Sequence, residues 1–97
     1  MAVYIIADNE VTDPETYREY AQRTSATVAQ YGGKFLARGG QVETLEGGWK
    51  PGRFVILEFP SVERARAWYD GPEYSALKAM RRRASHSRLV LVHGAEH

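Results

Sequence analysis

The chain has 97 residues, of which 43% are hydrophobic and 26% charged, and it contains no cysteine. This composition is ordinary for one globular domain over residues 1–97, and it excludes a disulfide framework and thiol chemistry. The net charge of +1 argues against general attraction to nucleic acid, and no apolar run approaches the roughly 20 residues of a membrane span. Because the first residues also lack a basic leader, we expect a cytoplasmic protein.

The first part of the chain predicts a strand, a helix and a second strand. Residues 3–10 are rich in Val, Tyr and Ile, which favours a strand. Asp13 and Pro14 are typical of a helix start, because Asp accepts from free amides and Pro fits the first helical position. Apolar side chains recur at helical spacing up to residue 31, where a Gly-Gly pair ends the helix. Residues 34–40 form the next predicted strand.

The second part of the chain repeats this order. Residues 41–52 form a glycine-rich connection to residues 53–59, which have the strongest strand pattern of the chain. A Pro-Ser pair then begins a second helix, a third helix follows over residues 73–84, and residues 88–94 form the last strand. The order βαββαβ, with its second helix split, predicts an α+β ferredoxin-like fold, with helices on one face of a four-stranded antiparallel sheet.

Both faces of the predicted sheet are apolar near its centre. In the strand 53–59, Val55 and Leu57 point to one side, and Phe54 and Ile56 to the other. The helices of one chain can cover only one of these faces. We therefore expect the other face to pack against the same face of a second copy, which gives a homodimer through the sheets.

Two charged residues, Arg38 and Glu58, lie within otherwise apolar predicted strands. Glu58 is in phase with apolar neighbours, and both residues are expected to point into the space between sheet and helices. Burial there would raise the pKa of Glu58 and make it a catalytic general base, unless Arg38 pairs with it and the two orient an anionic substrate. The alternative is a structural ion pair or a carboxylate that reaches water.

Three consecutive arginines lie on the third predicted helix. Arg81 follows Tyr74 and Leu77 at helical spacing, so it is predicted to turn inward, towards an acid or a ligand carboxylate. Arg82 and Arg83 are predicted to face water. Without a recognition motif, these arginines do not predict nucleic-acid binding.

Aromatic side chains with polar tips are the other candidate ligand contacts: Tyr20, Trp49, Trp68 and Tyr74. The helical spacing of the tyrosines is equally typical of ordinary core packing, so both interpretations stay open. Trp49 differs because it lies in a glycine-rich loop without periodicity. We expect it to close over a pocket or to cover the dimer contact.

No cofactor or metal site is expected. The histidines, His86, His93 and His97, lack the spacing of a zinc site. The glycine pairs of the middle segment are not followed by a helix start that could hold a phosphate.

A series of short motifs runs along the whole chain: Asp13 with Tyr17 and Tyr20, Gly32-Gly33, Arg38-Gly39-Gly40, Glu46-Gly47-Gly48-Trp49, Pro51 with Arg53, Glu58-Phe59-Pro60-Ser61, Ala65 to Trp68, Glu73-Tyr74, Arg81 and Val92-His93-Gly94. In this order and spacing they resemble the domain-of-unknown-function family 1330, within the dimeric α+β barrel superfamily. The resemblance implies a ferredoxin-like fold and a dimer of packed sheets, and it implies no established reaction. Superfamily relatives include cofactor-free oxygenases of aromatic compounds, lactone isomerases and haem-binding enzymes. The fold alone therefore does not decide among these activities.

Two hypotheses follow from the sequence. In the first, the protein binds a small metabolite between sheet and helices and acts as a cofactor-free enzyme with a Glu/Arg site. In the second, it is a non-catalytic binding or structural homodimer whose polar residues only hold the fold.

Overall fold

Four strands and three helices make up most of the chain, which a computed structural model describes over residues 1–95. In chain order they are β1 (Val3–Val11), α1 (Pro14–Gln30), β2 (Lys34–Arg38), β3 (Arg53–Phe59), α2 (Val62–Asp70), α3 (Pro72–Ala84) and β4 (Ser85–His93). The strands pair antiparallel in the order β2-β3-β1-β4. The predicted βαββαβ ferredoxin-like fold, with a split second helix, is confirmed.

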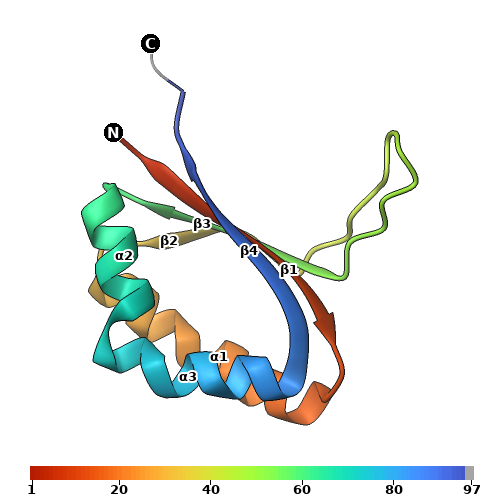
Figure 1. The fold of residues 1–97 in the computed structure, drawn as a ribbon, viewed down its shortest axis with the longest axis horizontal. Coiled ribbons are helices and arrows are strands. Elements are labelled where there is room, and N and C mark those ends of the chain that lie inside the picture. The colour runs from red at the N-terminus through yellow and green to blue at the C-terminus, as the bar shows by residue number, and fades with distance from the viewer. Residues whose placement is uncertain (96–97) are drawn as a thin grey trace.

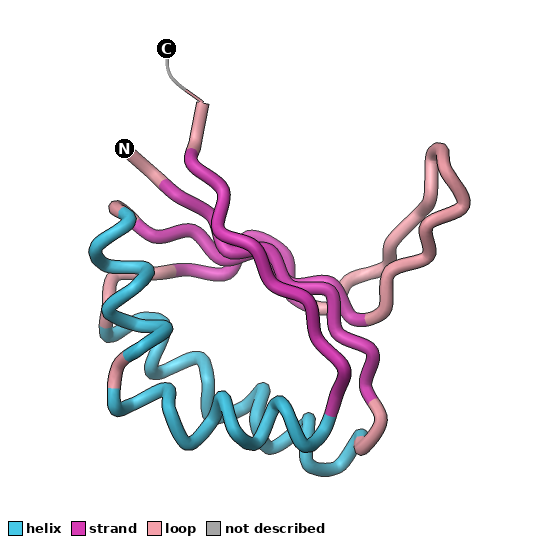
Figure 2. Tube along the Cα trace, viewed as in Figure 1, coloured by secondary structure: helices cyan, strands magenta, loops and turns pink. Residues whose placement is uncertain are grey.

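The three helices lie together on one side of the sheet, here called the inner face (Figure 1). The connection between β2 and β3, residues 39–52, projects away from the helices as a long arm without regular structure (Figure 2). The other side of the sheet, the outer face, has no helix over it (Figure 1). No helix within residues 1–95 is long and apolar enough to cross a membrane.

Local signals fix the helix ends as predicted. The Asp13 side chain accepts from the amide of Thr16 at the start of α1, and Ser61 does the same for Arg64 at the start of α2. Gly32 follows α1 with φ +79°, a conformation that favours glycine. These contacts satisfy amides and carbonyls that a helix end leaves free.

The last strand begins three residues earlier than predicted. α3 ends at Ala84 and runs directly into β4, whose first residue, Ser85, pairs with Val11 at the end of β1. The Ala84 carbonyl accepts from the amides of Thr12 and Asp13 and so closes this corner. β4 therefore lies beside the whole of β1. This pairing places the first serines of β4, Ser85 and Ser87, in the sheet.

The core lies between the inner face and the helices. Its strand residues include Val3, Ile5, Leu57 and Phe59, and its helix residues include Tyr17, Tyr20, Val28, Trp68, Tyr74 and Leu77. On β3 the buried and less buried residues alternate, so Leu57 and Phe59 face the core while Glu58 between them does not.

Candidate functional site

A cavity of about 40 Å³ lies within this core, between the inner face of the sheet, α1 and α3. Its wall is mostly apolar, and the polar residues that line it are Asn9, Tyr17, Tyr20, Thr24, Arg38, Arg53, Tyr74 and Arg81. Of the residues that the sequence singled out, Arg38, Tyr20, Trp68, Tyr74 and Arg81 meet here, and Glu58 and Trp49 do not.

Arg38 reaches the cavity because of an irregularity in β2. Phe35 pairs with Leu57, but Arg38 pairs with Val55, so one extra residue shifts the register between Phe35 and Ala37. The shift turns Arg38 to the inner face, where its guanidinium lies 4.2 Å from the centre of the Phe35 ring. The Nη2 of Arg38 donates to the carbonyl of Ala21 on α1, at 2.5 Å. Arg38 is exposed, so it bridges β2 and α1 at the edge of the cavity.

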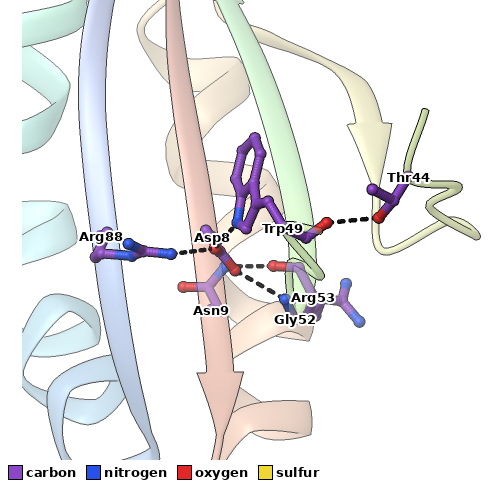
Figure 3. Close-up of polar contacts among 7 residues, drawn as sticks. All are labelled: Asp8, Asn9, Thr44, Trp49, Gly52, Arg53 and Arg88. Carbon is purple, nitrogen blue, oxygen red and sulfur yellow. Dashed lines mark hydrogen bonds and ion pairs between the residues drawn. The ribbon is translucent and has the colours of Figure 1, made fainter. Parts of the chain in front are cut away.

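Arg53 is held at the start of β3 by two adjacent residues of β1 (Figure 3). On the inner face, Nδ2 of the buried Asn9 donates to the carbonyl of Arg53 at 3.1 Å. On the outer face, Asp8 accepts from the amide of Gly52 at 2.8 Å. The guanidinium of Arg53 then lies over the ring of Tyr17, 5.3 Å from its centre. The two contacts fix the backbone from which Arg53 enters the cavity.

Arg81 and two tyrosines form the deepest polar group of the cavity. Arg81, on α3, is only 4% exposed, and its Nη1 donates to the hydroxyl of Tyr74 at 2.9 Å. The Tyr74 hydroxyl lies 2.6 Å from the hydroxyl of Tyr20 on α1. The prediction that Arg81 turns inward while Arg82 and Arg83 face water is confirmed.

Burial favours the protonated form of two cavity tyrosines, Tyr74 and Tyr17. Burial, reinforced by the neighbouring Tyr20, raises the pKa of Tyr74 far above its usual value, although Arg81 acts in the opposite direction. Burial also raises the pKa of Tyr17, and the nearby Arg53 only partly offsets this effect. Trp68 completes the wall, with its ring 4.1 Å from that of Tyr74 and its Nε1 donating to Thr27.

The charge in the cavity is entirely positive. Arg38, Arg53 and Arg81 line it, and no Asp or Glu is among its lining residues within the described part of the chain. None of these arginines belongs to an ion pair between described residues. The Nε atoms of Arg53 and Arg81 are buried and have no acceptor there. Such a cavity is suited to a ligand with negative charge.

The expectation that Glu58 shares this space with Arg38 is wrong. Glu58 lies on the outer face, where it pairs in register with Lys34, and their side chains approach to 3.3 Å. Arg38 lies at the other end of β2 and on the other face. The phase of Glu58 with Phe54 showed which residues share a face, but not which face the helices cover.

Trp49 also lies outside the cavity. It is 54% exposed and belongs to the projecting arm, whose end folds back over the outer face (Figure 3). Its Nε1 donates to Asp8 at 3.3 Å, and its ring meets that of Phe54 edge-on at 5.9 Å. Asp8 also accepts from Arg88 at 2.8 Å. Burial of Asp8 would raise its pKa, but hydrogen bonds from Gly52, Arg88 and Trp49 outweigh this and lower the pKa below its usual value.

Several residues of the cavity, among them Asn9 and Arg53, were not among the candidates from the sequence. Asn9 follows Val3, Ile5 and Ala7 at every second position of β1, so a polar residue in an apolar phase was the available signal. Its side chain is buried and accepts from Ser87 at 2.7 Å. Arg53 is likewise a polar residue in phase with apolar residues of its strand, Val55 and Leu57 of β3. Of the histidines, His97 lies outside the described residues.

Comparison with protein families identifies the chain. The family model called domain of unknown function DUF1330 matches residues 2–95. The chain belongs to the DUF1330 family. This confirms the resemblance that the sequence motifs indicated. A search of curated proteins finds no match to this DUF1330 chain.

Solved structures with low sequence identity share the fold. RPA0582 of Rhodopseudomonas palustris, a protein of unknown function, is 19% identical with a TM-score of 0.77, over 98% of this chain and 83% of that one. SnoaB, a cofactor-independent oxygenase of Streptomyces nogalater, is 18% identical with a TM-score of 0.69, over 99% and 95%. A dimeric protein of ferredoxin-like fold from Bacteroides fragilis is 12% identical with a TM-score of 0.55, over 93% of each chain. At these identities the likeness shows the fold alone.

Proposed function

We propose that this DUF1330 domain binds a small metabolite in the cavity between the sheet and the helices. The observation that carries the proposal is the convergence of five residues from four elements on one cavity: Arg38 of β2, Tyr20 of α1, Trp68 of α2, and Tyr74 and Arg81 of α3. Small-molecule sites typically combine apolar and aromatic walls with a few polar groups that fix orientation, as this cavity does.

An enzymatic form of this proposal uses side chains alone. Glu58 cannot serve as the base inside this cavity, because it lies on the outer face. The hydroxyls of Tyr20 and Tyr74, together with Arg81, can instead stabilise negative charge that develops on a bound substrate. The fold that this chain shares with a cofactor-independent oxygenase supports such chemistry by analogy of fold.

Native mass spectrometry tests the binding proposal. Protein incubated with a bacterial metabolite extract and then desalted should retain a small molecule, visible as added mass. Ala21 lines the cavity and lies beneath Arg38, so Ala21→Phe should abolish the added mass. Ala26→Phe, on the exposed side of the same helix, should retain it. No added mass in any protein, or equal added mass in all three, would contradict the proposal.

The outer face favours a second function, self-association. Val90, Val92 and Leu36 expose large apolar side chains on it, and the arm adds exposed Leu45 and Trp49. The proposed homodimer packs this face against that of a second copy, as the sequence suggested. A protein of the same fold is dimeric, which supports the proposal. The two functions are compatible, because they use opposite faces of the sheet.

A further inference from the structure

The cavity is lined by two guanidinium groups, those of Arg53 and Arg81, that no carboxylate in the described chain neutralises. A guanidinium keeps its proton throughout the physiological range, so Arg53 and Arg81 stay positive inside the protein. A buried charge without a partner costs several kcal/mol, and the penalty falls when an opposite charge with good hydrogen-bond geometry shares the site. The Nε–H groups of both residues are buried and have no acceptor among residues 1–95. Both side chains line the cavity, so an anion there would meet the remaining N–H groups of their guanidiniums.

The tyrosine pair adds a third donor. Arginine can only donate, so the Tyr74 oxygen accepts from Arg81 Nη1. Tyr74 is fully buried, and its own hydrogen needs an acceptor, for which the oxygen of Tyr20 at 2.6 Å is the partner in the described structure. Tyr74 therefore donates to Tyr20. The hydroxyl hydrogen of Tyr20, at the end of this chain, is left to donate into the cavity that Tyr20 lines.

The neighbouring polar groups are already engaged and do not compete for these donors. The side-chain oxygen of Asn9 accepts from Ser87, and its nitrogen donates to the backbone of Arg53. The hydroxyl of Thr24 donates to the carbonyl of Tyr20 at 2.6 Å. The groups left for a ligand are thus the free guanidinium N–H groups of Arg53 and Arg81 and the hydroxyls of Tyr17 and Tyr20.

The size of the cavity limits what can fill it. A cavity of about 40 Å³ has room for only a few heavy atoms. A carboxylate group is small enough to enter such a space. Any larger remainder of the ligand would extend towards Arg38, whose side chain bridges to Ala21 at the edge.

We propose that the ligand of this cavity is a small carboxylate, whose oxygens accept from the guanidinium groups of Arg53 and Arg81 and from the Tyr20 hydroxyl. The proposal rests on the small-molecule function proposed above and names its substrate class. A carboxylate has about four acceptor positions and no donor, which complements a site that presents donors only. Its single negative charge partly neutralises the positive charge of the cavity.

Thermal unfolding with acetate and acetamide as probes tests the proposal, because the two molecules share a shape and differ in charge. At pH 7 and constant ionic strength, acetate should raise Tm by roughly 4–8 °C when about 80% of the sites are occupied. Acetamide at the same concentration should leave Tm unchanged. Arg81→Met should lose the response to acetate, whereas Arg82→Met, on the exposed side of the same helix, should keep it.

Arg53→Met gives a second variant of the same kind, so that the test does not depend on the folding of one protein. Equal responses to acetate and acetamide would overturn the carboxylate inference and leave the small-molecule site standing. The inference would also be overturned if the wild type did not respond to acetate. It would be overturned as well if Arg81→Met and Arg53→Met responded to acetate as strongly as the wild type does. Failure of the small-molecule function would show separately, as the absence of added mass in the extract experiment.

Discussion

The two faces of the sheet carry their charges in opposite ways. On the outer face, Asp8 pairs with Arg88 at 2.8 Å, and Lys34 pairs with Glu58 at 3.3 Å. On the inner face, Arg53 and Arg81 have no carboxylate partner among the described residues. Neutral pairs suit a surface that another protein surface covers, whereas unpaired cations suit a site that receives an anion. The difference agrees with the proposed self-association through one face and the proposed ligand binding at the other.

The two tryptophans give the largest expected contrast between the faces. Trp68 is buried between Phe59 and Tyr74, so Trp68→Ala should lower the free energy of unfolding by about 3–5 kcal/mol. Trp49 lies on the arm and is largely exposed, so Trp49→Ala should lower it by no more than about 1 kcal/mol. Urea unfolding followed by circular dichroism measures both. Similar losses would remove the distinction between a packed inner face and an open outer face.

A charge on the outer face should separate the proposed dimer. Val90 is 57% exposed in the single chain, and Val90→Lys would bury an unpaired ammonium if two outer faces pack together. Since such a charge costs about 3 kcal/mol or more, self-association should weaken at least about 100-fold. Light scattering should give twice the chain mass of 10.9 kDa for the wild type and one chain mass for the variant.

Ala76→Lys, on the exposed side of α3, is the matched control and should leave the dimer intact. A wild-type mass near that of one chain at micromolar concentration would rule out the dimer. Of the two proposed functions, only ligand binding in the inner cavity would then remain.

The hydroxyl of Tyr74 should matter more than a hydroxyl on the outer face. Tyr74→Phe leaves Nη1 of the buried Arg81 without its acceptor, so the free energy of unfolding should fall by about 1–3 kcal/mol. Tyr4→Phe, on the outer side of β1, should change it by no more than about 0.5 kcal/mol. Chemical denaturation of both variants measures the difference. Equal effects would show that the hydrogen-bonded chain from Arg81 to Tyr20 does not stabilise the protein.

The smallest expected effect is a loss of stability in acid, through Asp8 on the outer face. Asp8 has a lowered pKa in the folded protein, so it contributes stability above its unfolded pKa of about 3.9. This contribution should be lost as the pH falls through the lower folded pKa. The stability difference between the wild type and Asp8→Asn should therefore be constant above about pH 5 and shrink below about pH 4. Thermal melts across this range measure it, and a difference that grows in acid would contradict the assignment.

The fold was predictable because its signals are local. Strand 53–59 was predicted with the bounds that the structure shows, and the caps Asp13 and Ser61 begin their helices as expected. Arg81 was predictable as well, since helical spacing relates it to Tyr74 on one buried side. Each of these predictions uses only residues that are neighbours in the sequence.

The site was only partly predictable, because it depends on how distant segments meet. Alternation in β3 placed Glu58 with Phe54, but only the packing of the helices decides which face is the inner one. The register shift that turns Arg38 inward follows from pairing between β2 and β3 and leaves no pattern in the sequence. Trp49 lies in an irregular arm, where no periodicity could have predicted its contact with Asp8.

The central claim is that Arg81 is a buried cation without a carboxylate partner among the described residues, kept for a ligand, and the stability of Arg81→Met tests it most directly. Methionine retains the apolar stem of the side chain and removes the buried charge. In buffer without added carboxylate, the account predicts a free energy of unfolding equal to or above that of the wild type, because an unpaired buried charge is removed. A loss of about 3–5 kcal/mol would show that Arg81 is a compensated structural residue and would contradict the account.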